Sequence, residues 1–150
     1  MRAVIQRVKS SEVKIAGKVV GSIKKGLNLL LAIKEDDTDK DIDYIIKKTI
    51  HLRIFEDEEG KMNESLLDVE GELLVISQFT LYGDCRKGRR PSFSRSGAVD
   101  TAKEKYKKFL EKLKEEPVAK IETGEFQAEM EVTIVNDGPV TILLDSEKQF

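Results

Sequence analysis

The sequence predicts an α+β protein: a curled, mostly antiparallel sheet or a β-barrel with two helices packed outside it. Short segments rich in branched apolar residues recur along most of the chain, and no regular strand–helix alternation separates them. Two other segments carry apolar residues at the 3.6-residue helical period. The chain has 150 residues, of which 39% are hydrophobic, so we expect one domain, residues 1–150, with an ordinary core.

The first third of the chain is expected to form four strands and then a helix. The strands are Ala3–Val8, Val13–Ala16, Val19–Ile23 and Leu27–Ile33. The last of these is almost wholly apolar, so it should be covered on both faces. Helix-start residues at Asp36–Asp39 precede isoleucines at helical spacing, which predicts the first helix.

The remaining elements follow from the same patterns. We expect strands at Arg53–Phe55, Leu73–Ile76, Val118–Thr123, Glu129–Val135 and Val140–Leu144, a turn at Glu56–Gly60, and a second helix from about Asp100 to Glu115. Lys61–Asp68 has no clear period. Asn136–Pro139 has the composition of a hairpin turn, and pattern alone predicts a trans bond before Pro139.

Composition narrows the possible functions. Lys and Arg total 26 and Asp and Glu 28, so the net charge of −2 gives no general attraction to nucleic acid. One cysteine, Cys85, excludes an internal disulfide, and together with the only histidine, His51, it cannot form a Cys/His zinc site. No apolar run approaches the about 18 residues of a membrane span, and no signal peptide is evident. We therefore expect a cytoplasmic protein without membrane contact, metal or cofactor.

Polar side chains follow directly after the apolar run Leu73–Ile76. Ser77, Gln78 and Thr80 come before any Gly or Pro, so they do not form an ordinary turn. We interpret Ser77–Leu81 as the floor of a site held by a rigid strand. The alternative is simple period-2 alternation, in which Gln78 and Thr80 point outward.

A basic segment comes next. Cys85–Gly97 contains five cations and no acidic residue: Arg86, Lys87, Arg89, Arg90 and Arg95. Such a cluster suits contact with phosphates, and its alternative is a solvated flexible loop.

Two motifs resemble a known signature. Ser77-Gln78-Phe79-Thr80-Leu81, together with Asn136-Asp137-Gly138-Pro139-Val140-Thr141, is similar to the paired motifs of the D-aminoacyl-tRNA deacylases. Four further segments resemble the family in the expected order, so the similarity spans nearly the whole chain: Ile5–Val8, Arg53–Phe55, Gly60–Asn63 and Arg90–Ser94. The resemblance implies hydrolysis of the ester that links a D-amino acid, or mischarged glycine, to the 3′ end of tRNA.

The resemblance also implies roles for the first motif. Its catalytic residues would be Ser77, Gln78, Phe79 and Thr80. The main-chain N–H groups of Phe79 and Thr80 would stabilise the oxyanion, and a terminal ribose hydroxyl of the tRNA would assist. Thr80 acting as a nucleophile would need an activating base, and the sequence shows none.

In the family, the dipeptide Gly138-Pro139 is cis and reaches into the pocket of a partner subunit, where its carbonyls bind the substrate's α-amino group. A rigid backbone there would reject L-residues by steric overlap and admit glycine. The resemblance therefore implies a homodimer with sites at the interface. It also assigns substrate binding to Arg7, Met62, Asn63, Asn136 and Thr141, and tRNA binding to Arg86, Lys87, Arg89, Arg90 and Arg95.

Two other functions remain open from the sequence. One is a non-catalytic RNA-binding module of the same fold that uses only the basic loop. The other is a hydrolase of free D-amino-acid esters or peptides, for which the basic loop would be irrelevant.

Overall fold

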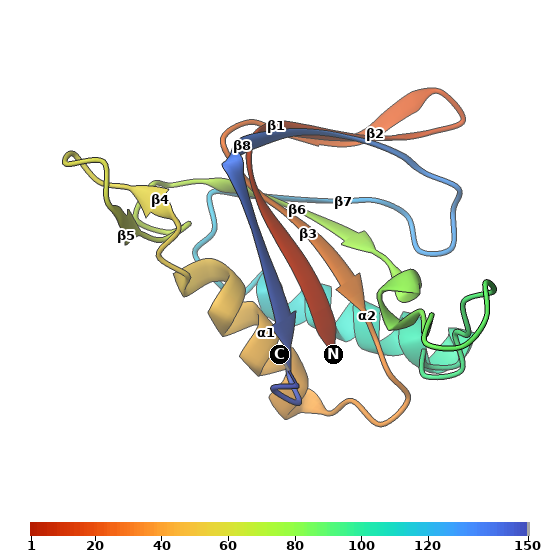
Figure 1. Ribbon diagram of the computed structural model, residues 1–150. Helices are drawn as coiled ribbons and strands as arrows, with labels where there is room; N and C mark the ends of the chain where they lie inside the picture. Colours follow the sequence, from red (N-terminus) through yellow and green to blue (C-terminus); the bar gives the residue numbers. More distant parts are fainter. Residues whose placement is uncertain (150) are drawn as a thin grey trace.

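The computed structural model describes residues 1–149. Its main element is a six-stranded sheet (Figure 1). Its strands are β1 (Arg2–Ile15), β2 (Lys18–Ile23), β3 (Gly26–Ala32), β6 (Glu72–Ser77), β7 (Lys120–Thr123) and β8 (Glu131–Asp145). They pair in the order β2-β1-β3-β6-β7, and β8 also pairs with β1. The β3–β6 and β6–β7 pairs are parallel and the others antiparallel. This curled, nearly closed sheet confirms the expected fold class.

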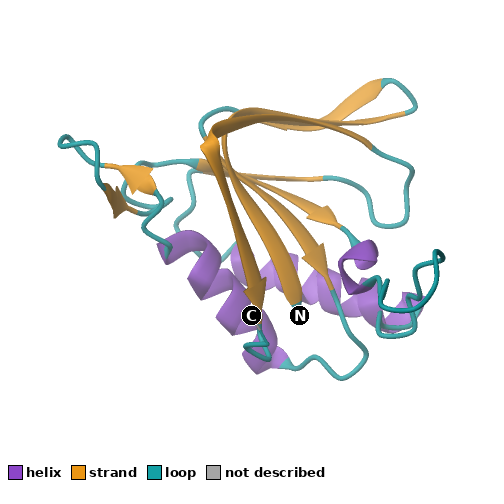
Figure 2. Ribbon diagram, viewed as in Figure 1, coloured by secondary structure: helices purple, strands orange, loops and turns teal. Residues whose placement is uncertain are grey.

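Two helices cover one side of this sheet (Figure 2): α1 (Asp39–His51) and α2 (Val99–Leu113). The start of α1 is capped locally, because the Asp41 carboxylate accepts the Thr38 N–H at 2.7 Å. The start of α2 is capped from a distance. Glu35, just after β3, accepts the Ala98 N–H at 2.7 Å. Neither helix in residues 1–149 has the length and apolar character needed to cross a bilayer.

The core has two parts, and β6 contributes to both. Leu73 and Val75 face the larger cluster, which the sheet shares with the helices. Leu74 and Ile76 face a smaller cluster with Val8 of β1 inside the curl of the sheet. Burial on both faces explains the uninterrupted apolar run in β6 and makes it a fixed support for whatever follows Ser77.

The expected hairpin at Asn136–Pro139 is wrong. β8 runs through this segment as one strand, with Gln6 opposite Thr141 and Val8 opposite Asn136. One residue of β1, Arg7, therefore faces the four residues Asp137 to Val140, which form a bulge. The turn-like composition is real, but pairing with β1 on both sides keeps the chain from reversing. β1 is likewise continuous where two strands were expected.

One further expectation is wrong, and one segment that had no assignment gains one. The segment after Ser77 is not strand: β6 ends there, and Phe79–Tyr82 form a short 3-10 helix, η1. Within Lys61–Asp68, which showed no period, Met62–Glu64 (β5) pairs with Phe55–Glu56 (β4). Figure 1 shows this small hairpin projecting beyond the main sheet.

Candidate functional site

A cavity of about 500 Å³ opens beside η1, at the end of β6. Of the predicted catalytic residues, Ser77, Gln78 and Phe79 line it. Thr80 does not, but its hydroxyl accepts a hydrogen bond of 2.5 Å from the Gln78 side-chain amide. Three of the four predicted catalytic residues therefore line one cavity, and the fourth is hydrogen-bonded to a residue that does.

The turn after β6 is held on several sides. The Gln78 N–H donates to the Leu31 carbonyl at 2.7 Å, which extends the pairing with β3 one residue past the strand. The Ser96 hydroxyl donates to the Phe79 carbonyl at 3.1 Å. The Gly83 N–H closes the far end by donating to the Thr80 carbonyl at 2.9 Å. The backbone of η1 is thus fixed by groups from other segments as well as its own.

The main-chain N–H groups of Phe79 and Thr80 begin this short helix. The first amides of a helix have no acceptor within it. Across residues 1–149, neither amide donates to a carbonyl of another segment. The Phe79 side chain is 57% exposed, and its ring meets that of Phe93 edge-on at 5.2 Å between centroids. The Phe79 amide therefore belongs to a residue that lines the cavity, the Thr80 amide follows it directly, and neither is used by a carbonyl of another described segment.

The other side of the cavity comes from segments that sequence reasoning missed. Phe126, Gln127, Ala128 and Met130 line it from the loop between β7 and β8. Ser96 and Gly97 contribute from the segment before α2, and Val99 and Ala102 contribute from its first turn. Gln127 has φ +66°, an uncommon backbone conformation for a side-chain-bearing residue. The local pattern placed Met130 in an expected strand and assigned Phe126 to Ala128 no element, so it marked none of them as a site residue.

Among the residues that the structure describes, no ionisable side chain lines the cavity. Within residues 1–149, no three His, Cys, Asp or Glu side chains gather as metal ligands would. The only histidine, His51, is exposed at the end of α1 and is not among the lining residues. The polar groups that the described residues offer here are main-chain N–H groups, hydroxyls and side-chain amides, Gln78 among them.

The second motif forms the bulge of β8. Its Gly138-Pro139 bond is cis, which confirms the expectation from the resemblance and overturns the trans bond expected from pattern. Both residues are exposed. The Asn136 side-chain oxygen accepts the Val140 N–H at 3.0 Å, which closes the bulge across its base.

Arg7, on the neighbouring strand β1, lies opposite this bulge. Its side chain is 6% exposed, and its Nη1 donates to the Ile54 carbonyl at 2.7 Å. Gly138 has φ +124°, and a Cβ there would lie 3.1 Å from Arg7 Nη2. The bulge and the guanidinium therefore fit only because residue 138 is glycine.

The other predicted substrate residues belong to two elements: Thr141 follows the bulge in β8, and Met62 and Asn63 lie in β5. Thr141 accepts long hydrogen bonds of 3.4 Å from Gln6 and Asn136. Met62 and Asn63 belong to the projecting hairpin, where Arg53 Nε donates to the Asn63 carbonyl at 2.7 Å. None of these residues lines the cavity, and neither do Arg7, Gly138 and Pro139. The cavity and the bulge are thus two separate features of the chain.

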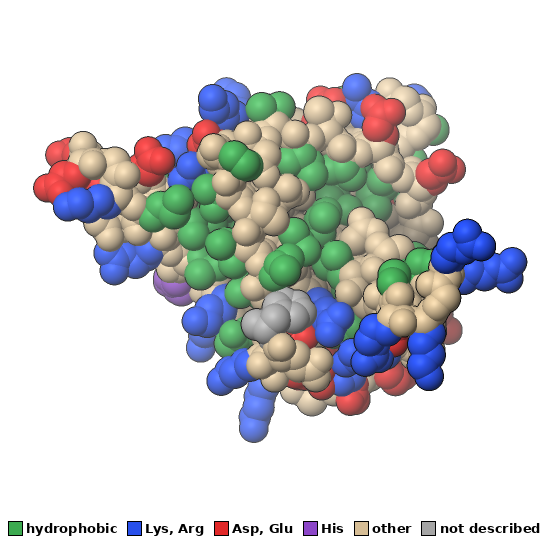
Figure 3. Space-filling model, in the orientation of Figure 1, with side chains coloured by type: hydrophobic (Ala, Val, Ile, Leu, Met, Phe, Trp, Pro, Cys, Tyr) green, Lys and Arg blue, Asp and Glu red, His purple; other side chains and the backbone are tan. Residues whose placement is uncertain are grey.

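The basic loop projects beyond the end of the sheet, where Figure 3 shows Lys and Arg side chains gathered. Its cations differ in their partners. Arg86 pairs with Asp84 at 2.6 Å and holds the pKa of that carboxyl well below its ordinary value. Arg95 reaches Glu147 at 3.8 Å. In the part of the chain that the structure describes, Lys87, Arg89 and Arg90 are exposed and form no ion pair, which leaves three cations for an external anion.

The chain matches known proteins along nearly its whole length. The model of a family described as D-Tyr-tRNA(Tyr) deacylase matches residues 4–145. Two relatives called D-aminoacyl-tRNA deacylase, from Clostridium tetani and Thermosipho melanesiensis, are 61% and 56% identical over 150 residues, the whole of each chain.

Two solved structures share the fold. A c-Myc DNA unwinding element binding protein has a TM-score of 0.91 at 41% identity, covering 97% of this chain and 98% of that one. A probable eukaryotic D-amino acid tRNA deacylase has a TM-score of 0.80 at 18% identity, covering 95% and 97%. The second likeness concerns the fold alone.

Proposed function

The chain belongs to the D-Tyr-tRNA(Tyr) deacylase family and is a hydrolase of the aminoacyl-tRNA ester bond; we propose that it acts on D-aminoacyl-tRNA and mischarged glycyl-tRNA through two half-sites from different subunits. The products are the free amino acid and tRNA. One observation supports the mechanism: the Phe79 amide, at a cavity that no ionisable side chain of residues 1–149 lines, and the adjacent Thr80 amide both lack a main-chain acceptor among those residues.

An aminoacyl ester is already activated, so its hydrolysis chiefly needs an oriented water and stabilisation of the negative oxygen that develops. The Phe79 and Thr80 amides supply two fixed donors for that oxygen. Water adds to the carbonyl carbon, the ester C–O bond breaks, and the departing ribose oxygen takes up a proton. A neighbouring ribose hydroxyl of the tRNA assists this transfer, since the cavity has no side-chain base.

Thr80 acts in this scheme as a positioning group. Its hydroxyl accepts a hydrogen bond from Gln78, and no carboxylate or imidazole lines the adjoining cavity to remove its proton. Gln78 and Thr80 together orient the substrate, while Ser77 lines the cavity beneath them.

Chirality is filtered by Gly138-Pro139 from a second copy of the chain. The dipeptide is exposed on its bulge and absent from the cavity of its own protomer, so a partner must deliver it. Its carbonyls bind the α-amino group and leave room for only a hydrogen where an L-residue carries its side chain. Glycine has no side chain to exclude, so glycyl-tRNA passes the same filter.

The second copy packs on the outer face of β8. Val135 and Leu143 are 45% and 57% exposed on this strand, on either side of the bulge. Figure 3 shows apolar side chains gathered over β8 and β1 on the face turned to the viewer. A two-fold dimer through this face covers that apolar surface and places each bulge near the partner.

The tRNA backbone is held by the basic loop, chiefly by Lys87, Arg89 and Arg90, whose charges have no intramolecular partner among the described residues. These cations recognise phosphate without reading sequence.

Incubation with D-Tyr-tRNA and L-Tyr-tRNA tests the proposal. Loss of only the D-ester is expected. Loss of neither ester would indicate an RNA-binding module, and equally efficient cleavage of small D-amino-acid esters would indicate a hydrolase without tRNA dependence. Thr80→Ala is expected to keep measurable activity. A folded, tRNA-binding but wholly inactive Thr80→Ala would assign the nucleophile to Thr80.

A further inference from the structure

We infer that Arg2, at the start of β1, is a positioning residue for the proposed deacylation: it fixes the position of η1, the short helix that carries the Phe79 and Thr80 amides. The inference rests on the proposed function of those amides. Its structural part, the bracing of η1 by Arg2, can be tested without any activity.

Arg2 contacts both of the last two residues of η1. Its Nη1 donates to the Leu81 carbonyl at 3.3 Å. Its guanidinium also lies over the Tyr82 ring, 4.9 Å from the centroid. Arg2 therefore links the first residue of β1 to the last two residues of η1. The Phe79 and Thr80 amides belong to the first two residues of the same helix.

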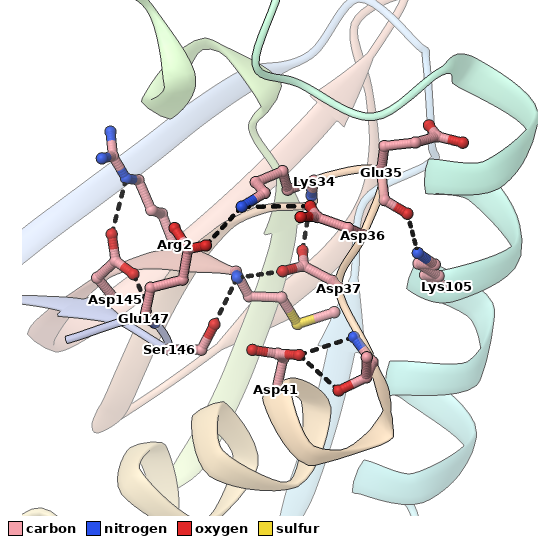
Figure 4. Close-up of polar contacts among 12 residues, drawn as sticks. Arg2, Lys34, Glu35, Asp36, Asp37, Asp41, Lys105, Asp145, Ser146 and Glu147 are labelled. Atoms are coloured by element: carbon pink, nitrogen blue, oxygen red, sulfur yellow. Dashed lines mark hydrogen bonds and ion pairs between the residues drawn. The ribbon is translucent and has the colours of Figure 1, made fainter. Parts of the chain in front are cut away.

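Arg2 is itself held in place. Its Nε donates to Asp145 at 3.0 Å, and that carboxylate is 1% exposed (Figure 4). The backbone before it is anchored too, because the ammonium of Met1 bonds Asp37 at 2.5 Å and the Ser146 hydroxyl at 2.6 Å. The guanidinium is therefore held in a fixed position beside η1, because its partner Asp145 and the preceding residue, Met1, are both buried.

Tyr82 depends on such support. The residue is 1% exposed, and its hydroxyl has no hydrogen-bond partner among the described residues. The hydroxyl therefore does not hold the Tyr82 side chain in place by a hydrogen bond. Instead, two guanidiniums contact the ring, that of Arg2 and that of Arg95 at 5.8 Å, and Arg95 is in turn within 3.8 Å of Glu147.

A shift at Tyr82 must reach the catalytic amides. η1 has only four residues, so Phe79 and Tyr82 are separated by a single turn. A misplacement of about 1 Å in a catalytic group can lower a rate by about 10²-fold. Because Arg2 is not among the described residues that line the cavity and does not belong to the basic loop, its loss should affect the chemical step and leave tRNA binding nearly unchanged.

The kinetic test compares Arg2→Ala, Arg2→Lys and a control, Lys112→Ala, under saturating D-Tyr-tRNA. Lys112 joins α2 to α1 through Asp43 at 2.7 Å and lies outside the site. We expect kcat of Arg2→Ala to fall about tenfold with KM within about twofold. Arg2→Lys should recover part of the loss, because an ammonium keeps the charge over the ring but not the planar fork. Lys112→Ala should keep its kcat. An unchanged kcat in folded Arg2→Ala would overturn the inference.

Hydrogen exchange gives a readout independent of activity. The Leu81 and Gly83 amides, which donate to the Gln78 and Thr80 carbonyls, should exchange faster in Arg2→Ala than in wild type, and Lys112→Ala should not change them. Unchanged exchange in Arg2→Ala would overturn the bracing role. If the wild type failed to hydrolyse D-Tyr-tRNA while Arg2→Ala loosened η1, the proposed function would fall and the bracing of η1 would stand.

Discussion

Arg7 Nε donates a hydrogen bond of 3.2 Å to the main-chain carbonyl of Asp137, the residue immediately before the cis Gly138-Pro139 bond. The same guanidinium is anchored to the Ile54 carbonyl at 2.7 Å. A buried arginine thus ties the bulge of β8 to the segment that enters β4, which makes the exposed dipeptide a rigid part of the surface.

Arg7→Lys should damage this arrangement without removing the charge. A lysine presents a compact ammonium and cannot reach both carbonyls in the geometry of a planar fork. We expect kcat/KM for D-Tyr-tRNA to fall at least about tenfold, since the α-amino group would meet a displaced Gly138 carbonyl. Assays on the D- and L-esters measure both rate and selectivity. Wild-type values for both would show that Arg7 does not set the filter.

Gly138→Ala should destabilise the protein and abolish activity. The new Cβ would lie 2.8 Å from the Val140 side chain, at a φ of +124° that side-chain-bearing residues rarely adopt. We expect a loss of about 2–3 kcal/mol in the free energy of unfolding. Gly17→Ala is the matched control: φ is +76° but nothing lies within 4 Å, so about 1 kcal/mol and unchanged activity are expected. Equal effects at both positions would argue against a close fit at Gly138.

Mixing two inactive variants tests whether the site is shared. A Gly138→Ala subunit keeps its own cavity, and a Gln78→Ala subunit keeps its own bulge. A heterodimer of the two therefore contains one intact site, and co-expression should restore activity that neither homodimer has. No restoration in purified heterodimers would place both half-sites in one subunit.

Leu143→Glu should separate the subunits. Leu143 is 57% exposed on β8, and a buried carboxylate at the proposed interface would have no partner. Sedimentation should show the monomer mass, and deacylation should be lost together with the dimer. Lys107→Glu on the exposed side of α2 also adds a carboxylate, with an even larger change in net charge, and should leave both unchanged. A dimeric, active Leu143→Glu would exclude this face.

Asp41 should contribute to stability in a pH-dependent way. Burial alone would raise its pKa, but hydrogen bonds from Ser146 and Thr38 outweigh burial and lower the pKa from 3.8 to about 2. Since the folded pKa lies below the ordinary value, the stabilisation is fully present above pH 3.8 and is lost as pH falls through about 2. It is worth about 1 kcal/mol after solvent screening.

Urea unfolding of wild type and Asp41→Asn measures this contribution. The wild type should be more stable near neutral pH, and the difference should shrink towards about pH 2. A difference that stays constant across this range would assign the effect to lost packing instead of ionisation.

Binding of tRNA should weaken with salt, and the cations of the basic loop should contribute unequally. Arg90→Ala should lower the slope of log affinity against log salt by about 0.7–1, as expected for one lost phosphate contact. Arg86→Ala should lower it less, because Asp84 already neutralises that charge at 2.6 Å. Equal slopes for the two variants would show that the Arg86–Asp84 pair opens on binding.

The sequence by itself determined the secondary structure of most of the chain. The isoleucines of α1 and the apolar run of β6 define their elements, because helical and strand periods are properties of adjacent residues. The family resemblance gave the cis Gly138-Pro139 bond that the local pattern did not.

Only the tertiary structure decided how these segments pair and which residues meet at the cavity. Asn136–Pro139 became a bulge instead of a turn because β1 pairs with β8 on both sides of it. The wall of the cavity at Phe126 and Met130, and the support of Tyr82 by Arg2, join residues far apart in the chain. Such contacts follow from the pairing and packing of whole elements, and no period within a short window of sequence records them.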